Sequence, residues 1–271
     1  MSGGRLREVN VRPLTGSDEA MLADTAAGLM PAERTSALLA RCIDTEVGTA
    51  GGTLDLVRRL TVGDREALLL HLHRLTFGDA LHCVLDCPDN SCRERMDVDL
   101  SVSSLLSPTY DDSREWYDLP RDPGMTPLRF RIPTGADQEW ASRLAQTDAG
   151  EAAIALVNRC LAESDETPPT PASLDEVTAH RLAIAMLEHD PQAEIMLDVT
   201  CPACGHTCQT LFDAGGFLYR ELEARLPQLY REVHAVALHY HWSEAEILGL
   251  TQPQRQRYLD LLAETVATES A

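Results

Sequence analysis

Four of the eight cysteines stand in two pairs whose spacing suits a metal ion. Cys87 and Cys92 enclose one turn that begins Cys-Pro, and Cys201 and Cys204 form a Cys-Pro-x-Cys turn. Thiolate pairs in tight turns are common zinc ligands, and a structural zinc ion takes four ligands in a tetrahedron. Because each turn offers only two thiols, the economical solution is one shared site. We therefore expect one structural zinc ion, bound by Cys87, Cys92, Cys201 and Cys204.

Other uses of these cysteines stay open at the level of sequence. Each pair could form its own site, completed by His82 or His73 in the first half and by His206 or Cys208 in the second, or no metal could bind. Thiol–disulfide exchange is disfavoured, because a redox Cys-x-x-Cys pair opens a helix that lowers the thiol pKa, whereas a strand pattern follows Cys204.

The elements that must position the cysteines are strands. Apolar and polar residues alternate over 81–86 and again over 96–100, on either side of the first turn. The same alternation runs through 195–199 before the second turn and returns after it at 210–212. Such a period of two indicates strands, so each cysteine pair is expected at the tip of a two-stranded ribbon.

Both halves of the chain repeat the same landmarks in the same order. Three segments return after 119, 118 and 114 residues: Thr15–Asp18 as Thr134–Asp137, Ala37–Ile43 as Ala155–Leu161, and Cys87–Pro88 as Cys201–Pro202. A unit of about 100 residues is too long for a solenoid repeat and indicates a duplicated domain. In this register Cys42 matches Cys160 within a helix, and Cys208 matches Met96, which favours packing roles for these cysteines.

The fold class predicted from these patterns is α+β. It consists of a tandem duplicated helical domain with two-stranded zinc-ribbon-like turns, plus a C-terminal helical extension. The expected units are a first repeat with its cysteine turn (1–106), a linker (107–125), a second repeat with the Cys-Pro-x-Cys turn (126–216) and the extension (217–271). The linker is assigned because its Pro, Asp, Gly and Ser residues show little periodicity.

Composition limits the classes of partner. The formal charge of −20 repels phosphate backbones, so we expect no general nucleic-acid binding. No apolar stretch follows Met1 and no long apolar run occurs, so we expect neither a signal peptide nor a membrane span. Cysteines without an export signal indicate a reducing, cytoplasmic location, where pairs bind metal more often than they form disulfides.

The C-terminal extension contains the candidate partner-binding residues. Its long helix has an apolar stripe, and further apolar side chains follow at Trp242, Ile247, Leu248 and Tyr258. Amphipathic helices appended to a closed core often lie in a groove of a partner protein. The alternative is that these helices only cover the second repeat.

Several motifs resemble one family of proteins. They are Arg12–Gly16, Leu75–Asp79, Cys201–His206, Phe217–Leu222 and Trp242–Leu248. Together they resemble baseplate hub assembly chaperones of T-even-type phages and the baseplate-like proteins of contractile injection systems. The resemblance implies a protein that helps to build a phage-tail-like baseplate, or a minor part of it, with baseplate, spike or hub proteins as partners.

The function expected from the sequence is therefore that of a non-enzymatic, zinc-binding assembly chaperone or minor structural protein of a contractile injection system baseplate. No nucleophile elbow, P-loop, dinucleotide-binding or HExxH motif occurs. The alternative is a zinc-ribbon regulatory protein that contacts nucleic acid or the transcription machinery, which would require a basic face.

Overall fold

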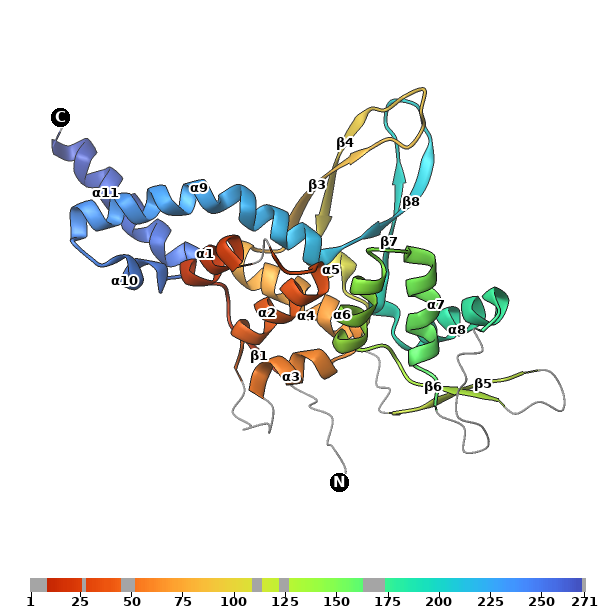
Figure 1. Cartoon of the computed structure of the whole chain (residues 1–271). Helices are drawn as coiled ribbons and strands as arrows, with labels where there is room; N and C mark the ends of the chain where they lie inside the picture. Colours follow the sequence, from red (N-terminus) through yellow and green to blue (C-terminus); the bar gives the residue numbers. More distant parts are fainter. Residues whose placement is uncertain are drawn as a thin grey trace.

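The computed structural model describes residues 9–25, 28–44, 52–108, 114–121, 127–162 and 174–269. Residues 1–8, parts of the predicted linker (109–113 and 122–125) and residue 126 lie outside the described residues. Within these ranges, helices combine with antiparallel strand pairs, which is the α+β arrangement expected from the sequence (Figure 1). No helix of the described chain has both the length and the apolar character that crossing a membrane needs.

The first half starts with strands and helices and ends in a ribbon. Its elements are β1 (Asn10–Val11), α1 (Gly16–Thr25), α2 (Pro31–Cys42), β2 (Ile43–Asp44), α3 (Gly52–Arg59), α4 (Val62–Phe77), β3 (Ala80–Asp86), β4 (Arg95–Ser101) and α5 (Val102–Leu105). The side chain of Thr61 caps α4 by accepting a hydrogen bond from the Asp64 N–H. Gly78 ends this helix at φ 98°, a conformation that favours glycine, and β3 follows at once.

The second half also places helices before a two-stranded ribbon. They are β5 (Tyr117–Leu119), β6 (Leu128–Phe130), α6 (Gly135–Leu144), α7 (Ala149–Arg159), α8 (Glu176–His189), the short 3₁₀ helix η2 (Pro191–Ala193), β7 (Ile195–Thr200) and β8 (Thr207–Phe212). β5 lies inside the predicted linker and pairs with β6. Tyr117 of this strand is buried and stacks on Phe130, so this part of the predicted linker contributes to the core.

Three helices form the C-terminal part. They are the long α9 (Ala214–Tyr240), then α10 (Glu244–Leu248) and α11 (Gln252–Glu269). α9 begins where the Asp213 side chain accepts a hydrogen bond from the Gly216 N–H, and it ends at His241, which has a left-handed backbone. After this reversal α10 runs back beside α9. The chain then turns again, and α11 runs toward the C-terminal end of α9, with Arg255 near Glu232 and Tyr258 near Tyr240 (Figure 1).

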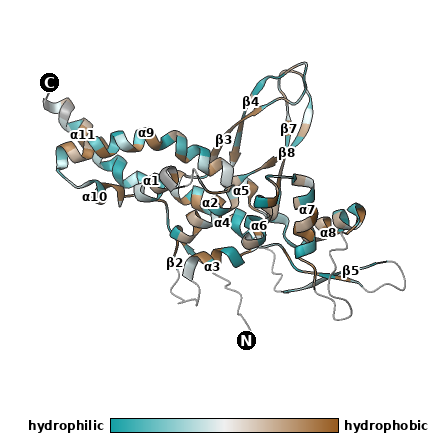
Figure 2. Ribbon diagram, in the orientation of Figure 1, coloured by the Kyte–Doolittle hydropathy of each residue, from teal (hydrophilic) through white to brown (hydrophobic). Residues whose placement is uncertain are grey.

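The described apolar side chains form three separate clusters. The largest joins α2 and α4 to the inner faces of both ribbons and to the start of α9. The second lies among β5, β6, α7 and α8, and the third lies between α9 and α10. Apolar and polar residues alternate in colour along the helices in Figure 2, and α2, α3 and α7 each have an apolar side and a polar side. Because both ribbons share the largest cluster, the second ribbon packs against the first half of the chain.

A buried aspartate organises the first helix start. Arg12 Nη1 donates to Asp18 Oδ2 at 2.6 Å, and Arg41 Nε donates to Asp18 Oδ1 at 2.8 Å. The N–H and the hydroxyl of Thr15 also donate to Asp18 Oδ2. Burial raises the pKa of Asp18, but the hydrogen bonds from Arg12, Thr15 and Arg41 outweigh it and lower this pKa to about 2.

The same contacts recur in the second half. Asp137 accepts from Arg131, from Arg159 Nε at 2.8 Å, and from the N–H and hydroxyl of Thr134. Its pKa is also lowered, because these hydrogen bonds outweigh the raising effect of burial. One residue after each second arginine lies a fully buried cysteine, Cys42 or Cys160, and burial raises the pKa of each thiol to about 12. Both cysteines thus occupy the packing positions expected from the sequence.

The two halves meet where the start of α4 lies against the start of α6. The Gly135 N–H donates to the Leu60 carbonyl at 3.0 Å, and Thr61 forms an antiparallel bridge with Thr134. The fully buried Arg65 lies beside Gly135, donating to the hydroxyl of Ser36 at 2.8 Å. A side chain at position 135 would occupy the space of this guanidinium, so glycine is required there.

Candidate metal centre

The two ribbons project from the helical body and their tips come together (Figure 1). β3 pairs with β4, and β7 pairs with β8, in regular antiparallel register. Along β7 buried and exposed residues alternate without a break, because the inward side chains pack into the largest cluster. The chain reverses at the end of β3 and of β7, and these reversals hold the four predicted cysteine ligands.

Both turns close in a similar way. The first cysteine closes each turn, since the Cys87 N–H donates to the Glu94 carbonyl and the Cys201 N–H donates to the His206 carbonyl, both at 2.8 Å. The residue after the second cysteine has a left-handed backbone in each turn: Arg93 with φ 52° and Gly205 with φ 76°. This conformation is ordinary for glycine and uncommon for arginine. The longer spacing of the first pair therefore does not alter the way its turn closes.

The four sulfur atoms converge between the tips. Cys87 Sγ lies 3.7 Å from Cys204 Sγ, and Cys92 Sγ lies 3.8 Å from Cys201 Sγ, so each short contact joins one ribbon to the other. All four lie within 4.8 Å of one another. A tetrahedral zinc ion with Zn–S bonds of about 2.3 Å requires S–S separations of about 3.8 Å, whereas a disulfide bond is about 2.05 Å long. The spacing therefore fits metal ligation, and all eight cysteines are free of disulfide bonds.

The electrostatics of the turns favour a thiolate at one position. The backbone N–H of Cys204, followed by that of Ala203, lowers the pKa of Cys201 to about 7, against the opposing effect of burial. Burial raises the pKa of Cys87 to about 12, and the neighbouring thiols add to this rise. Four crowded thiols cannot all ionise without a counter-charge, so a divalent cation is the natural complement to this group.

The remaining candidate ligands lie elsewhere. His73 pairs with Glu221, and His82 pairs with Asp99 on the exposed face of its ribbon. Cys208 faces Val199 across the ribbon and packs against the largest cluster. Among the described residues, the four turn cysteines form the only group of three or more side chains arranged to hold a metal ion. The geometry thus favours the shared site over two separate sites.

The candidate partner-binding residues gather in the third cluster. Ile247 is fully buried against α9, and Trp242, Leu248 and Tyr258 are partly buried around it. The rings of Trp242 and Tyr258 lie 4.8 Å apart in an edge-on arrangement. Partner contact by these residues remains a prediction, and only the partly exposed ones present surface for it.

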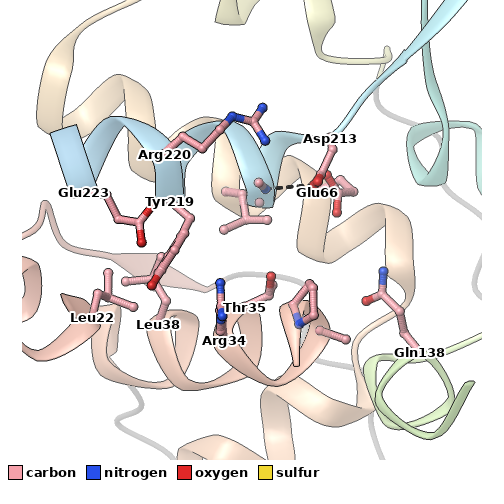
Figure 3. Close-up of a pocket in the computed structure, with 15 residues that line it drawn as sticks. Leu22, Arg34, Thr35, Leu38, Glu66, Gln138, Asp213, Tyr219, Arg220 and Glu223 are labelled. Carbon is pink, nitrogen blue, oxygen red and sulfur yellow. Dashed lines mark hydrogen bonds between the residues drawn. The ribbon is translucent and has the colours of Figure 1, made fainter. Parts of the chain in front are cut away.

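One titratable group that the sequence pattern did not single out lines a cavity of about 390 Å³ between α2 and the start of α9 (Figure 3). It is the partly buried Glu66 of α4, which lies close to Asp213. Burial first, and then the charge of Asp213, raise the pKa of Glu66 to about 7. No local signal marks this residue, because a glutamate within a helix ordinarily faces solvent.

We expect Glu66→Gln to stabilise the protein at neutral to alkaline pH. The pKa of Glu66 is raised from 4.5 in the unfolded chain to about 7 in the folded one, so the folded state holds the extra proton and the free energy of unfolding falls as pH rises through that window. The neutral amide of the variant removes this loss. Above pH ~7 the free energy of unfolding of Glu66→Gln should therefore exceed that of the unaltered protein by about 1–2 kcal/mol, a value reduced for the partial exposure of the group. Urea unfolding of both proteins at pH ~5 and pH ~8 measures it.

The control for this prediction is Glu223→Gln, which alters an exposed carboxylate on the same cavity. It should change stability little at either pH. A constant difference between Glu66→Gln and the unaltered protein across the pH range would contradict the prediction.

Comparison with known protein families gives a match. The family model described as T4 bacteriophage base plate protein matches residues 2–218, which include both ribbons and all four turn cysteines. The match ends within the first turns of α9. No curated protein and no solved structure matches the chain. The family match confirms the resemblance drawn from the sequence motifs, and the chain belongs to the T4 bacteriophage base plate protein family.

Proposed function

We propose that this chain is a non-enzymatic, zinc-binding assembly chaperone or minor structural protein of the baseplate of a phage-tail-like contractile injection system. The observation that carries the proposal is the convergence of four thiols, two from each ribbon, in a chain of the base plate family. A four-cysteine site leaves no open coordination position for water or substrate, which is the arrangement of structural zinc and not of catalytic zinc.

The zinc ion would act as a clamp between the ribbons. β3–β4 and β7–β8 are separate two-stranded sheets, and a two-stranded ribbon alone is only marginally stable in water. A metal bound at the tips would fix the two ribbons to each other and hold their inner faces in the largest cluster. Cytoplasmic thiols are kept reduced, which keeps them available as ligands.

Internal duplication is part of the proposal, with repeats at 1–106 and 126–216. Its support is the recurrence of the buried aspartate with the same donors, of the buried cysteine after each second arginine, and of ribbons with matching turns. Two related halves that share one metal would place the ion close to the pseudo-twofold axis between them.

Baseplate, hub or spike proteins are the proposed partners, and a protein partner suits the charge of the chain. The exposed outer face of the first ribbon carries Asp97 and Asp99, and the formal charge of the chain is −20. Such surfaces repel phosphate, which disfavours the alternative of a nucleic-acid-binding regulator. We propose that the helical segment after α9 contributes to the protein contact through Trp242 and Tyr258.

Two measurements test this function. Elemental analysis of protein purified without chelator should give about one zinc ion per chain; a value near zero would refute the shared site. Co-expression with sheath, tube, hub and spike proteins encoded beside it should yield a stable complex or raise the yield of assembled baseplate. A chain that neither binds these proteins nor alters their assembly would exclude the baseplate role while leaving the zinc site unaffected.

A further inference from the structure

The start of α11 lies against the start of α1 in the same way as α4 lies against α6. The Gly16 N–H donates to the Leu250 carbonyl at 3.0 Å, and Thr15 forms an antiparallel bridge with Thr251. These contacts match those of Gly135 with Leu60 and of Thr134 with Thr61. We call the Thr-Gly helix starts at 15–16 and 134–135 acceptors. We call the segments 60–65 and 250–255, which both read Leu-Thr-x-x-x-Arg, donors. These names refer to the two sides of each contact, which we call a joint, and not to the direction of its hydrogen bonds.

The arginine that ends the donor is the main polar contact at the N-terminal acceptor. Arg255 is 1% exposed, and its Nη2 donates to Glu19 Oε1 at 2.8 Å while its Nε donates to Glu232 Oε2 at 3.0 Å. Its Nη1 donates to the Leu250 carbonyl within the donor itself. A buried guanidinium is tolerated only with such partners, so the site is specific for arginine at this position.

The acceptor glycine provides the space for the guanidinium. A Cβ atom at Gly16 would lie 2.8 Å from Arg255 Nη1 and 3.1 Å from a methyl group of Leu248. A Cβ atom at position 16 would therefore crowd the buried guanidinium, and the branched side chain of valine would crowd it further. In contrast, Gly28 has nothing within 4 Å of such an atom.

The second half does not supply another donor at the corresponding place. The start of α8 follows Leu174, but the residue five positions later is Ala179 and not an arginine. Within the described chain, donor 60–65 occupies the acceptor of the second half, and donor 250–255 at the C-terminal end occupies the acceptor of the first half. The last donor thus comes from outside both halves.

The segment that carries this donor is joined to the rest by a short connector. His241 adopts φ 54° and ψ 28°, a left-handed backbone that is uncommon for residues other than glycine, and there the chain turns back along α9. The segment packs in the third cluster, which is separate from the largest cluster. Residues 243–269 contribute no side chain to the largest cluster, and another backbone conformation at His241 would direct them away from α9.

We propose that the acceptor at 15–16 is a docking site for a Leu-Thr-x-x-x-Arg helix start, and that it takes the C-terminal donor of a second copy of this chain as well as its own. Each chain holds both parts, so exchange of residues 243–269 between two copies recreates every contact of the joint and changes only the connector. Exchange of an identical element is a low-cost route to dimers for this reason. The proposal does not depend on zinc or on a baseplate partner.

Complementation between two inactivated joints tests the proposal. A chain with Gly16→Val has a blocked acceptor and an intact donor, and a chain with Arg255→Ala has the reverse. Co-expressed with different affinity tags, the two can form one intact joint only between chains, and we expect them to co-purify in equal amounts. A Gly16→Val chain co-expressed with a chain carrying both substitutions has no intact joint and should not pair.

Each outcome decides the proposal. Two folded, monomeric variants that do not co-purify would overturn it, as would equal pairing in the control without a joint, since that would place the contact elsewhere. If either variant is insoluble alone, recovery of both in soluble form on co-expression supports the exchange. Insolubility of both variants on co-expression overturns it. Gly28→Val and Arg257→Ala, which alter exposed positions, control for the substitutions themselves.

Discussion

Cys204→Ser is expected to abolish zinc binding and to lower the free energy of unfolding more than any other single change considered for this chain. Structural zinc contributes on the order of 10 kcal/mol to the folding of small domains, and a three-cysteine remnant binds it far more weakly. The loss in free energy of unfolding is expected to be smaller here, at about 5 kcal/mol, because the inner faces of the ribbons retain their apolar contacts with the largest cluster. Urea unfolding and metal analysis of the same samples measure both effects.

Cys208→Ser is the matched control. This cysteine lies in the same ribbon as Cys204 but packs against the largest cluster without joining the thiol group. It should keep its zinc and lose about 1 kcal/mol or less, since the side chain is only partly buried. Equal stability of Cys204→Ser and Cys208→Ser, with zinc absent from both and from the unaltered protein, would refute the metal clamp.

Asp137→Asn is expected to lower the free energy of unfolding by about 2–3 kcal/mol, because it replaces a buried carboxylate that accepts hydrogen bonds from two guanidinium groups. Asp137 is 2% exposed, and its carboxylate accepts from Arg131, Arg159 and Thr134. The neutral amide leaves the two guanidinium groups without their counter-charge, and its NH₂ group faces donors. Thermal and urea unfolding of the variant quantify the loss, and Asp18→Asn should give a loss of similar size.

The control for this network is the exposed pair of Glu33 with Arg143, which spans the two halves. Glu33→Gln should cost less than about 1 kcal/mol, because water screens an exposed ion pair. A loss in Asp137→Asn no larger than that in Glu33→Gln would contradict the assigned role of the buried carboxylate.

The corresponding network around Asp18 gives a direction for acid unfolding. The pKa of Asp18 is lowered from 3.8 to about 2 in the folded chain, so its contribution is fully present above the unfolded value and is lost as pH falls through the folded value. Unfolding between pH ~4 and ~2 should therefore take up protons. In Asp18→Asn, this part of the pH dependence should be absent.

Local features of the molecule are predictable from its amino-acid sequence. Period-two alternation predicts the ribbon strands, and the structure places β3, β4, β7 and β8 there. The spacing of the cysteines, and their register between the two halves, also separate the four turn thiols from the thiols that pack. These features are predictable because a strand pattern or a turn depends on residues within a few positions of each other. The family resemblance likewise rests on short motifs, and the family match bears it out.

Contacts between residues far apart in the sequence depend on tertiary packing. Asp18 and Asp137 look like ordinary helix-start residues in the sequence, and their arginine partners Arg41 and Arg159 lie more than 20 positions away. Arg255 resembles an exposed helix residue, yet it is buried against Glu19, 236 positions earlier. Glu66 acquires its raised pKa from Asp213 and from burial under α9. In each case the burial of a charged group, and the charges that lie beside it, depend on how whole elements pack and leave no periodic trace in the chain.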